Sequence, residues 1–155
     1  MASLGYEVAD IVQGIWLAMF GTHVVPEDPA GFGGRRARAW TGIVHISGAW
    51  EGSLALQCAE PLVRRVTATT LGLPEEMVSL DHQHQALGEL ARMIGETFKT
   101  LLPEPCAVAK VETAVGPDFQ LQLPDAAQVL QVVLRADDQV FGVTVFQRLP
   151  QVTAR

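Results

Sequence analysis

The stretch LGELARMIGETFKTLLP, residues 87–103, repeats its apolar residues at the spacing of one helix face. This apolar face consists of Leu87, Leu90, Ala91, Ile94, Phe98 and Leu101. On the opposite side, polar residues recur at the same spacing and form what we call the polar ridge: Gln85, Glu89, Arg92 and Glu96. Pro103 and Pro105 end the pattern, because proline lacks the backbone N–H that a helix needs. The stretch therefore predicts a long amphipathic helix with one buried and one exposed face.

Two more helices are predicted before this one in the chain. Residues 5–20 place apolar side chains on a common face, and Gly21 follows as a C-cap. The segment EPLVRRVTATTLG, residues 60–72, carries Pro61 in its first turn, where the missing N–H costs nothing. Asp81 is the predicted N-cap of the long helix.

Strand-forming residues occupy most of the remaining chain. Trp40–Ser47 and Glu51–Cys58 predict a hairpin around Gly48-Ala49-Trp50. Further strands are predicted after the long helix, at Ala107–Ala114, Phe119–Leu123, Gln128–Arg135 and Val140–Gln147. The resulting order is α-β-β-α-α-β-β-β-β. Because the helices group together beside an antiparallel sheet, the sequence predicts an α+β domain with long helices packed on one face.

Composition and charge narrow the class of protein. The 155 residues suffice for a single domain, 1–155. Apolar residues make up 48% of the chain and charged residues 18%, which is typical of a globular protein. The net charge of −6 argues against a nucleic-acid partner. The sequence shows neither a secretion signal nor an apolar stretch near the roughly 20 residues that span a bilayer, so we expect no membrane partner and a cytoplasmic location. Cys58 and Cys106 are expected to be reduced and lack zinc-type spacing.

Residues 22–39 are rich in glycine, proline and arginine and are predicted to form a mobile loop. Within them, GFGGRRAR, residues 31–38, suggests a phosphate-binding loop. The segment lacks the spacing of the common nucleotide fingerprints, and no strong strand precedes it. A solvated basic loop is the better interpretation.

Taken together, these segments resemble the CheX-type chemotaxis phosphatases of the CheC/CheX superfamily. The resemblance is carried by WTGIVHISGAWEGSLALQ, by EPLVRRVTATTLG and, most specifically, by ALGELARMIGETFKTLL. It implies a CheC/CheX-like fold and a homodimer that shares an extended sheet. It also implies a role in two-component signalling, in which the protein docks on a phosphorylated response-regulator receiver domain and removes its aspartyl phosphate. The receiver would supply a divalent metal ion, and the chain would need no cofactor or metal of its own.

The resemblance also assigns roles on the polar ridge. Family members carry a Gly-Glu-Leu-x-Asn core on this helix, in which the glutamate binds a receiver lysine and the asparagine orients the attacking water. Glu89 matches the glutamate, and Arg92 stands where the asparagine would be. An amide both donates to and accepts from a water, whereas a guanidinium only donates. The binding half of the motif is therefore kept and the catalytic half is altered.

Three hypotheses for the polar ridge follow. In the first, the protein docks without hydrolysis, and Arg92 holds the phosphoryl oxygens. In the second, phosphatase activity survives because Gln85 positions the water. In the third, the ridge is an ordinary outer helix face of a non-catalytic dimeric scaffold, with Arg92 paired to Glu89 and Glu96. Gly88 and Gly95 flank the ridge and would let another surface approach closely.

Two other polar patterns have simpler interpretations. His82 and His84 suggest a metal site, but residues two apart on a helix point in different directions, so solvated histidines at the helix start are favoured. Glu7 and Asp10 resemble a weak second copy of the motif, and stabilisation of a helix N-terminus is the better interpretation.

Overall fold

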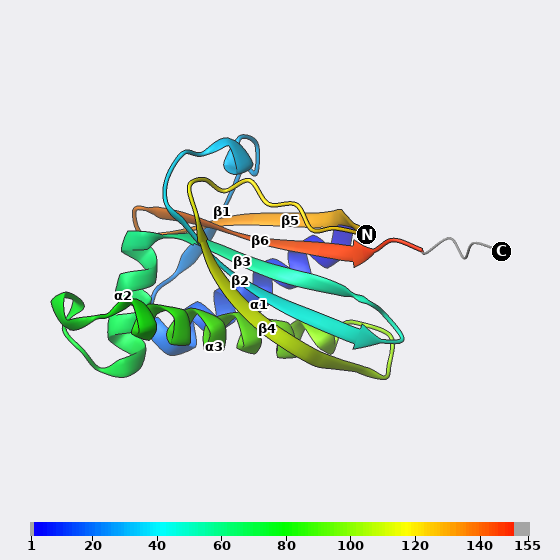
Figure 1. Cartoon of the computed structure of the whole chain (residues 1–155), viewed down its shortest axis with the longest axis horizontal. Coiled ribbons are helices and arrows are strands. Elements are labelled where there is room, and N and C mark those ends of the chain that lie inside the picture. Colours follow the sequence, from blue (N-terminus) through cyan, green and yellow to red (C-terminus); the bar gives the residue numbers. More distant parts are fainter. Residues whose placement is uncertain (1, 151–155) are drawn as a thin grey trace.

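The computed structural model describes residues 2–150, in which the helices lie on one side of an antiparallel sheet (Figure 1). The helices are α1 Ala2–Phe20, α2 Glu60–Leu71 and α3 Leu80–Lys99, with short 3-10 turns η1 Phe32–Gly34 and η2 Glu75–Met77. The strands are β1 Val24–Glu27, β2 Ala39–Gly48, β3 Gly52–Ala59, β4 Cys106–Gly116, β5 Ala126–Ala136 and β6 Gln139–Arg148. They form a 6-stranded sheet in the order β1-β5-β6-β3-β2-β4. The predicted α+β class is confirmed.

The core lies between the helices and the sheet. Alternate residues of the central strands point towards the helices, so that Val44 of β2, Leu56 of β3 and Val143 of β6 are all fully buried. On the helix side, Trp16 of α1 stacks on Phe141 of β6 with ring centroids 4.3 Å apart. The hairpin predicted from the sequence is formed by β2 and β3.

The prediction of a strand at Phe119–Leu123 is wrong. Phe119 is instead buried beside the sheet, where its ring packs on Phe32 at 4.9 Å and its backbone N–H donates to the carbonyl of Arg35. This segment crosses the sheet face away from the helices (Figure 1). Phe119 is therefore buried by packing on this face of the sheet, and in the described chain the segment pairs with no strand.

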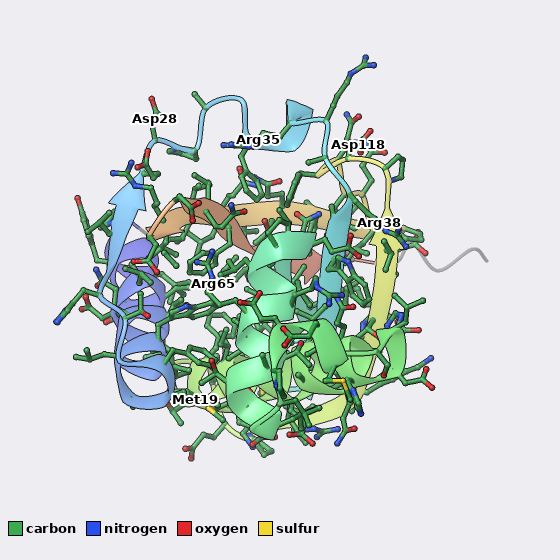
Figure 2. All side chains as sticks on the ribbon, turned by 90° about the vertical axis from the view of Figure 1, so that its left-hand side faces the viewer. Met19, Asp28, Arg35, Arg38, Arg65 and Asp118 are labelled. Carbon is green, nitrogen blue, oxygen red and sulfur yellow. The ribbon has the colours of Figure 1, made fainter. Side chains whose placement is uncertain are left out.

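Part of the predicted loop 22–39 is a strand. Val24–Glu27 form β1 and pair with the end of β5, with Val24 opposite Ala136. The observed order is thus α-β-β-β-α-α-β-β-β. The basic residues that follow are exposed, as predicted for a solvated loop, and Figure 2 shows Arg35 on this loop at the end of the molecule away from the helices. Arg38 makes a loose ion pair with Glu60 at 3.9 Å.

The long helix begins earlier than predicted. Ser79, not Asp81, is its N-cap, and the Ser79 hydroxyl accepts a hydrogen bond from the backbone N–H of His82. His82 completes the capping box by accepting from the Ser79 N–H at 3.1 Å. A capping box normally has Glu or Gln three residues after the N-cap. Because this position holds His82, the sequence did not indicate Ser79 as the N-cap.

Both cysteines are free thiols, as predicted. Cys58 is buried in β3, and burial raises the pKa of its thiol. Cys106 is half-buried and accepts a hydrogen bond from the backbone N–H of Trp50. Among residues 2–150, none of the helices is long and apolar enough to cross a membrane.

Candidate functional site

The polar ridge lies on the outer face of α3. The apolar face of the helix packs on β2 and β4, and its residues Leu87, Leu90, Ala91, Ile94 and Phe98 are buried as predicted. Leu101 follows the end of the helix and is 37% exposed, so it does not belong to the buried stripe. All members of the ridge, Gln85, Glu89, Arg92 and Glu96, are exposed to solvent. The helix therefore brings the predicted site residues together on a surface that a partner can reach.

The charges on this ridge do not neutralise one another. Within the described chain, neither Glu89 nor Arg92 takes part in an ion pair shorter than 4.0 Å, and the predicted pairs of Arg92 with Glu89 and Glu96 are not formed. Glu96 binds Lys99 instead, with Nζ 3.0 Å from Oε2. A carboxylate and a guanidinium thus lie one turn apart with their hydrogen-bonding capacity open to a partner.

The flanking glycines have a different role from the predicted one. Gly95 is buried against Val44 of β2, and a Cβ at Gly88 would meet the Thr113 side chain at 3.5 Å. Both glycines therefore face the sheet of the same chain. At these positions α3 is approached closely by strands β2 and β4 of the same chain, and not by a partner.

The histidines near the start of α3 are not free in solvent. His82 is engaged in the helix cap. His84 is half-buried, its Nδ1 lies 2.8 Å from the Thr113 hydroxyl, and its ring lies 4.7 Å from that of Trp40. The two side chains diverge as the helical spacing predicts. In the described part of the chain, no group of three or more His, Cys, Asp and Glu side chains is placed to hold a metal ion.

The weak motif on α1 is also placed by the structure. Glu7 and Asp10 are exposed, but α1 begins at Ala2, and its first turn contains no acidic residue. Their predicted role at the helix N-terminus is therefore wrong. They lie on the exposed side of the middle of the helix.

Sequence reasoning missed an apolar neighbour of the ridge. Met93 is 39% exposed and follows Glu89 by four residues, so it lies beside the ridge on α3. A methionine at this spacing outside the buried stripe was the available signal. Methionine and arginine are both enriched in protein interfaces. The carboxylates, guanidinium and amide of the ridge can bind and orient charged or polar groups on a partner.

Comparison with known proteins gives a consistent family. The model of the family described as chemotaxis phosphatase CheX matches residues 40–135. This range contains the hairpin, α2, α3 with the polar ridge, and β4. Among curated proteins, none matches the sequence.

Solved structures share the fold at low sequence identity. The CheX protein from Desulfovibrio desulfuricans superposes with a TM-score of 0.74 at 15% identity, covering 92% of this chain and 97% of that one. CheX from Vibrio vulnificus gives a TM-score of 0.73 at 15% identity, with 90% and 93% covered. A CheX from Borrelia burgdorferi, solved in a complex with CheY, BeF3 and Mg2+, gives 0.64 at 14% identity, with 91% and 96% covered.

Proposed function

This chain belongs to the CheX family of chemotaxis phosphatases, and we propose that it docks on a response-regulator receiver domain through the polar ridge of α3. The observation that carries this proposal is the pair of exposed, unneutralised charges at Glu89 and Arg92. Charges left open on one helix face provide both specificity and orientation in a protein interface. The complex of Borrelia burgdorferi CheX with CheY supports a receiver as the partner.

We further propose that hydrolysis of the receiver's aspartyl phosphate is lost or altered in this protein. An acyl phosphate is already activated, so its hydrolysis needs a water held in line more than a new nucleophile. Glu89 can pair with a lysine of the receiver. Arg92 can donate to phosphoryl oxygens but cannot accept a hydrogen bond from a water. Docking would therefore read or protect the phosphorylated state, with the divalent metal ion supplied by the receiver.

Active hydrolysis is the second candidate function. Gln85 is exposed one turn before Glu89 and carries an amide that can both donate to and accept from a water. If it takes the place of the family asparagine, the reaction survives with a displaced water. A non-catalytic scaffold that ignores the phosphate is the third candidate, and it needs no particular residue at position 92.

A homodimer is part of the proposal. The 11-residue strand β4 lies at one end of the sheet, and in the described chain its outer edge has no strand partner. At the other end, β1 has 4 residues. A long open edge is a template for pairing with a second copy. Light scattering should then give twice the mass of one chain, and we expect the dimer to act in the cytoplasm.

Phosphorylated receiver domains from the same organism test the main proposal. Phosphate loss and complex formation would be followed together, for the wild type and for Glu89→Gln. We expect binding that requires the phosphate, hydrolysis no faster than the receiver's own rate, and loss of binding in Glu89→Gln. Glu76→Gln removes an exposed carboxylate of η2 outside the ridge and should bind normally.

The alternatives give different results in the same experiment. Hydrolysis above the receiver's own rate that Gln85→Ala abolishes would establish the second candidate. Equal binding of the phosphorylated and unphosphorylated receiver would favour the scaffold. No binding to any receiver would contradict the proposal as a whole.

A further inference from the structure

The segment between β4 and β5 forms a strap over the sheet face that lies opposite the helices. We define the strap as residues 117–125. Near its start, the Phe119 carbonyl accepts a hydrogen bond from the Gln57 side chain at 3.3 Å. At its end, the Asp125 carbonyl accepts from the backbone N–H of Leu149 at 2.8 Å. Because the strap is tied near its start to β3 and at its end to the residue that follows β6, its middle bridges the space between them.

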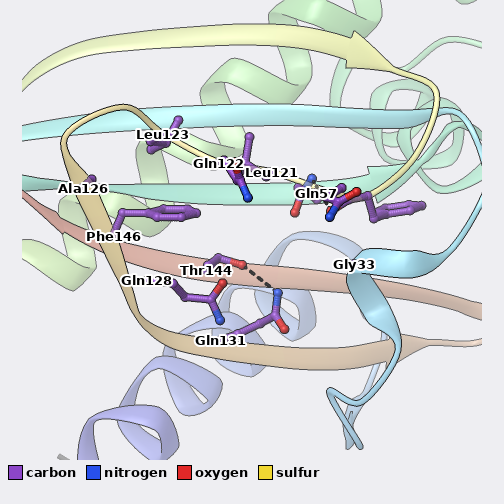
Figure 3. Close-up of a pocket in the computed structure, with 12 residues that line it drawn as sticks. Gly33, Gln57, Leu121, Gln122, Leu123, Ala126, Gln128, Gln131, Thr144 and Phe146 are labelled. Atoms are coloured by element: carbon purple, nitrogen blue, oxygen red, sulfur yellow. Dashed lines mark hydrogen bonds between the residues drawn. The ribbon is translucent and has the colours of Figure 1, made fainter.

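A cavity of about 480 Å³ lies under the strap (Figure 3). Its floor is formed by β3, β5 and β6, and Gly33 of η1 lines it from the side. The hydrogen-bonding side chains in its lining are the amides of Gln57, Gln120, Gln122, Gln128 and Gln131 and the hydroxyl of Thr144. The lining contains no charged residue. A cavity of this size is within the range of small-molecule sites.

Two of the amide groups, those of Gln57 and Gln131, are oriented before any ligand arrives. Gln57 is 2% exposed, and its Nε2 donates to the Phe119 carbonyl and to the Thr41 hydroxyl, at 3.3 and 3.4 Å. In the described chain, no hydrogen bond uses its Oε1. Gln131 donates from Nε2 to the Thr144 hydroxyl at 3.2 Å, drawn as a dashed line in Figure 3, which leaves Oε1 of Gln131 as an acceptor. The floor therefore presents acceptors of fixed direction.

The chemistry of the lining selects one class of ligand. An ion would lose its hydration without gaining a counter-charge, so a neutral ligand is favoured. A flat heterocycle would need an open aromatic face, but Phe119 and Phe146 are only 2% and 3% exposed. Hydroxyl groups both donate and accept, as amides do, and they match this lining best. We propose that the cavity binds a neutral polyhydroxylated molecule with the chemistry of a sugar ring.

This site is separate from the polar ridge. The strap over the cavity crosses the sheet face opposite the helices, whereas α3, which carries the ridge, lies on the other face (Figure 1). Loss of receiver docking would therefore leave the ligand site intact, and the converse also holds.

Titrations followed by two-dimensional 1H–15N NMR test the proposal on the full chain. The neutral probes are D-glucose and maltose, the charged probes are glucuronate and glucose 6-phosphate, and adenosine is the flat neutral probe. We expect saturable shifts of the Gln57 and Gln131 side-chain amides and of the strap with a neutral sugar. The charged sugars should bind about tenfold or more weakly. Absence of saturable binding by both neutral sugars at about 10 mM, or tighter binding of adenosine, would overturn the proposal.

Variants locate the binding. Gln128→Ala removes an exposed amide of the lining, and Gln131→Leu removes an acceptor without touching the ties of the strap. Each should weaken sugar binding by about tenfold, as expected when a ligand hydroxyl loses a hydrogen bond. Gln139→Ala, at the start of β6 and outside the cavity, is the matched control and should bind as the wild type does. Unchanged binding in both cavity variants would also overturn the proposal.

Discussion

Gly95 of α3 lies directly on Val44 of β2, at a separation that leaves no room for a side chain. A Cβ built on Gly95 would come 2.6 Å from Cγ1 of Val44, which is closer than carbon atoms can approach without displacement. Gly42 on the same strand faces Ala91 in a similar way, because a Cβ built on Gly42 would come 2.9 Å from Cβ of Ala91. Small residues on both elements thus set how closely α3 docks on the sheet, and hence where the polar ridge is held.

Gly95→Ala should lower the free energy of unfolding although alanine is the better helix former. Overpacking of this kind costs about 1–3 kcal/mol, more than the roughly 0.5–1 kcal/mol that alanine gains over glycine in a helix. Gly14→Ala is the matched control, because beyond its own stretch of helix no atom lies within 4 Å of the added Cβ, and it should raise stability. Urea denaturation of both variants measures the two effects. Stabilisation by Gly95→Ala would show that the contact can relax.

Arg92→Asn should restore hydrolysis if the fold otherwise retains a phosphatase scaffold. The substitution replaces a group that only donates by an amide that also accepts from a water. We expect the rate of receiver dephosphorylation to rise about tenfold or more, a change of about 1.4 kcal/mol in the barrier. Arg36→Asn, an exposed arginine of the basic loop, should leave the rate unchanged. A variant no faster than the wild type would show that more than residue 92 has been lost.

Glu112 should make stability fall in acid. A hydrogen bond with His45 and then one from Lys110 lower the pKa of Glu112 below its ordinary value of 4.5. Because the folded pKa is the depressed one, this contribution is present above the unfolded value and is lost as pH falls through the folded value.

Thermal unfolding of the wild type and Glu112→Gln from neutral pH to pH about 2 measures this effect. The melting temperatures should differ at neutral pH and converge in acid. A carboxyl titration by NMR should move towards the ordinary midpoint in Lys110→Met, whose ion pair with Glu112 measures 3.2 Å in the wild type. A constant difference between wild type and Glu112→Gln at every pH would contradict the assignment.

The helices and the hairpin were predictable because their patterns are local. The stripe from Leu87 to Phe98 repeats at helical spacing, and its burial follows whichever surface it meets. Phe119 shows the limit, since its apolar neighbours satisfy a strand pattern while its partner, Phe32, lies far away in the sequence. The position of the ridge on an exposed helix face was predictable, but the ion pairs that its side chains form were not. That Glu96 pairs with Lys99, leaving Arg92 open, depends on side-chain geometry.

The buried side-chain amide of Gln83, a residue of α3, offers a last test of packing. Gln83 is fully buried, and neither Nε2 nor Oε1 has a hydrogen-bond partner in the described chain. Nε1 of the buried Trp40 is likewise without one. Unpaired buried polar groups oppose folding, since they lose their bonds to water and gain none.

Gln83→Met keeps the length and flexibility of the side chain and removes both polar groups, so it should stabilise the protein by about 1–3 kcal/mol. The matched control is Gln13→Met on α1, because the Gln13 amide donates to the Val24 carbonyl at 3.1 Å. That variant should destabilise by about 0.5–1.5 kcal/mol, since it leaves the carbonyl without its donor. Urea unfolding of both variants gives the two signs directly. If Gln83→Met destabilises like Gln13→Met, the buried amide has a partner in solution, and a bound water becomes the explanation to examine.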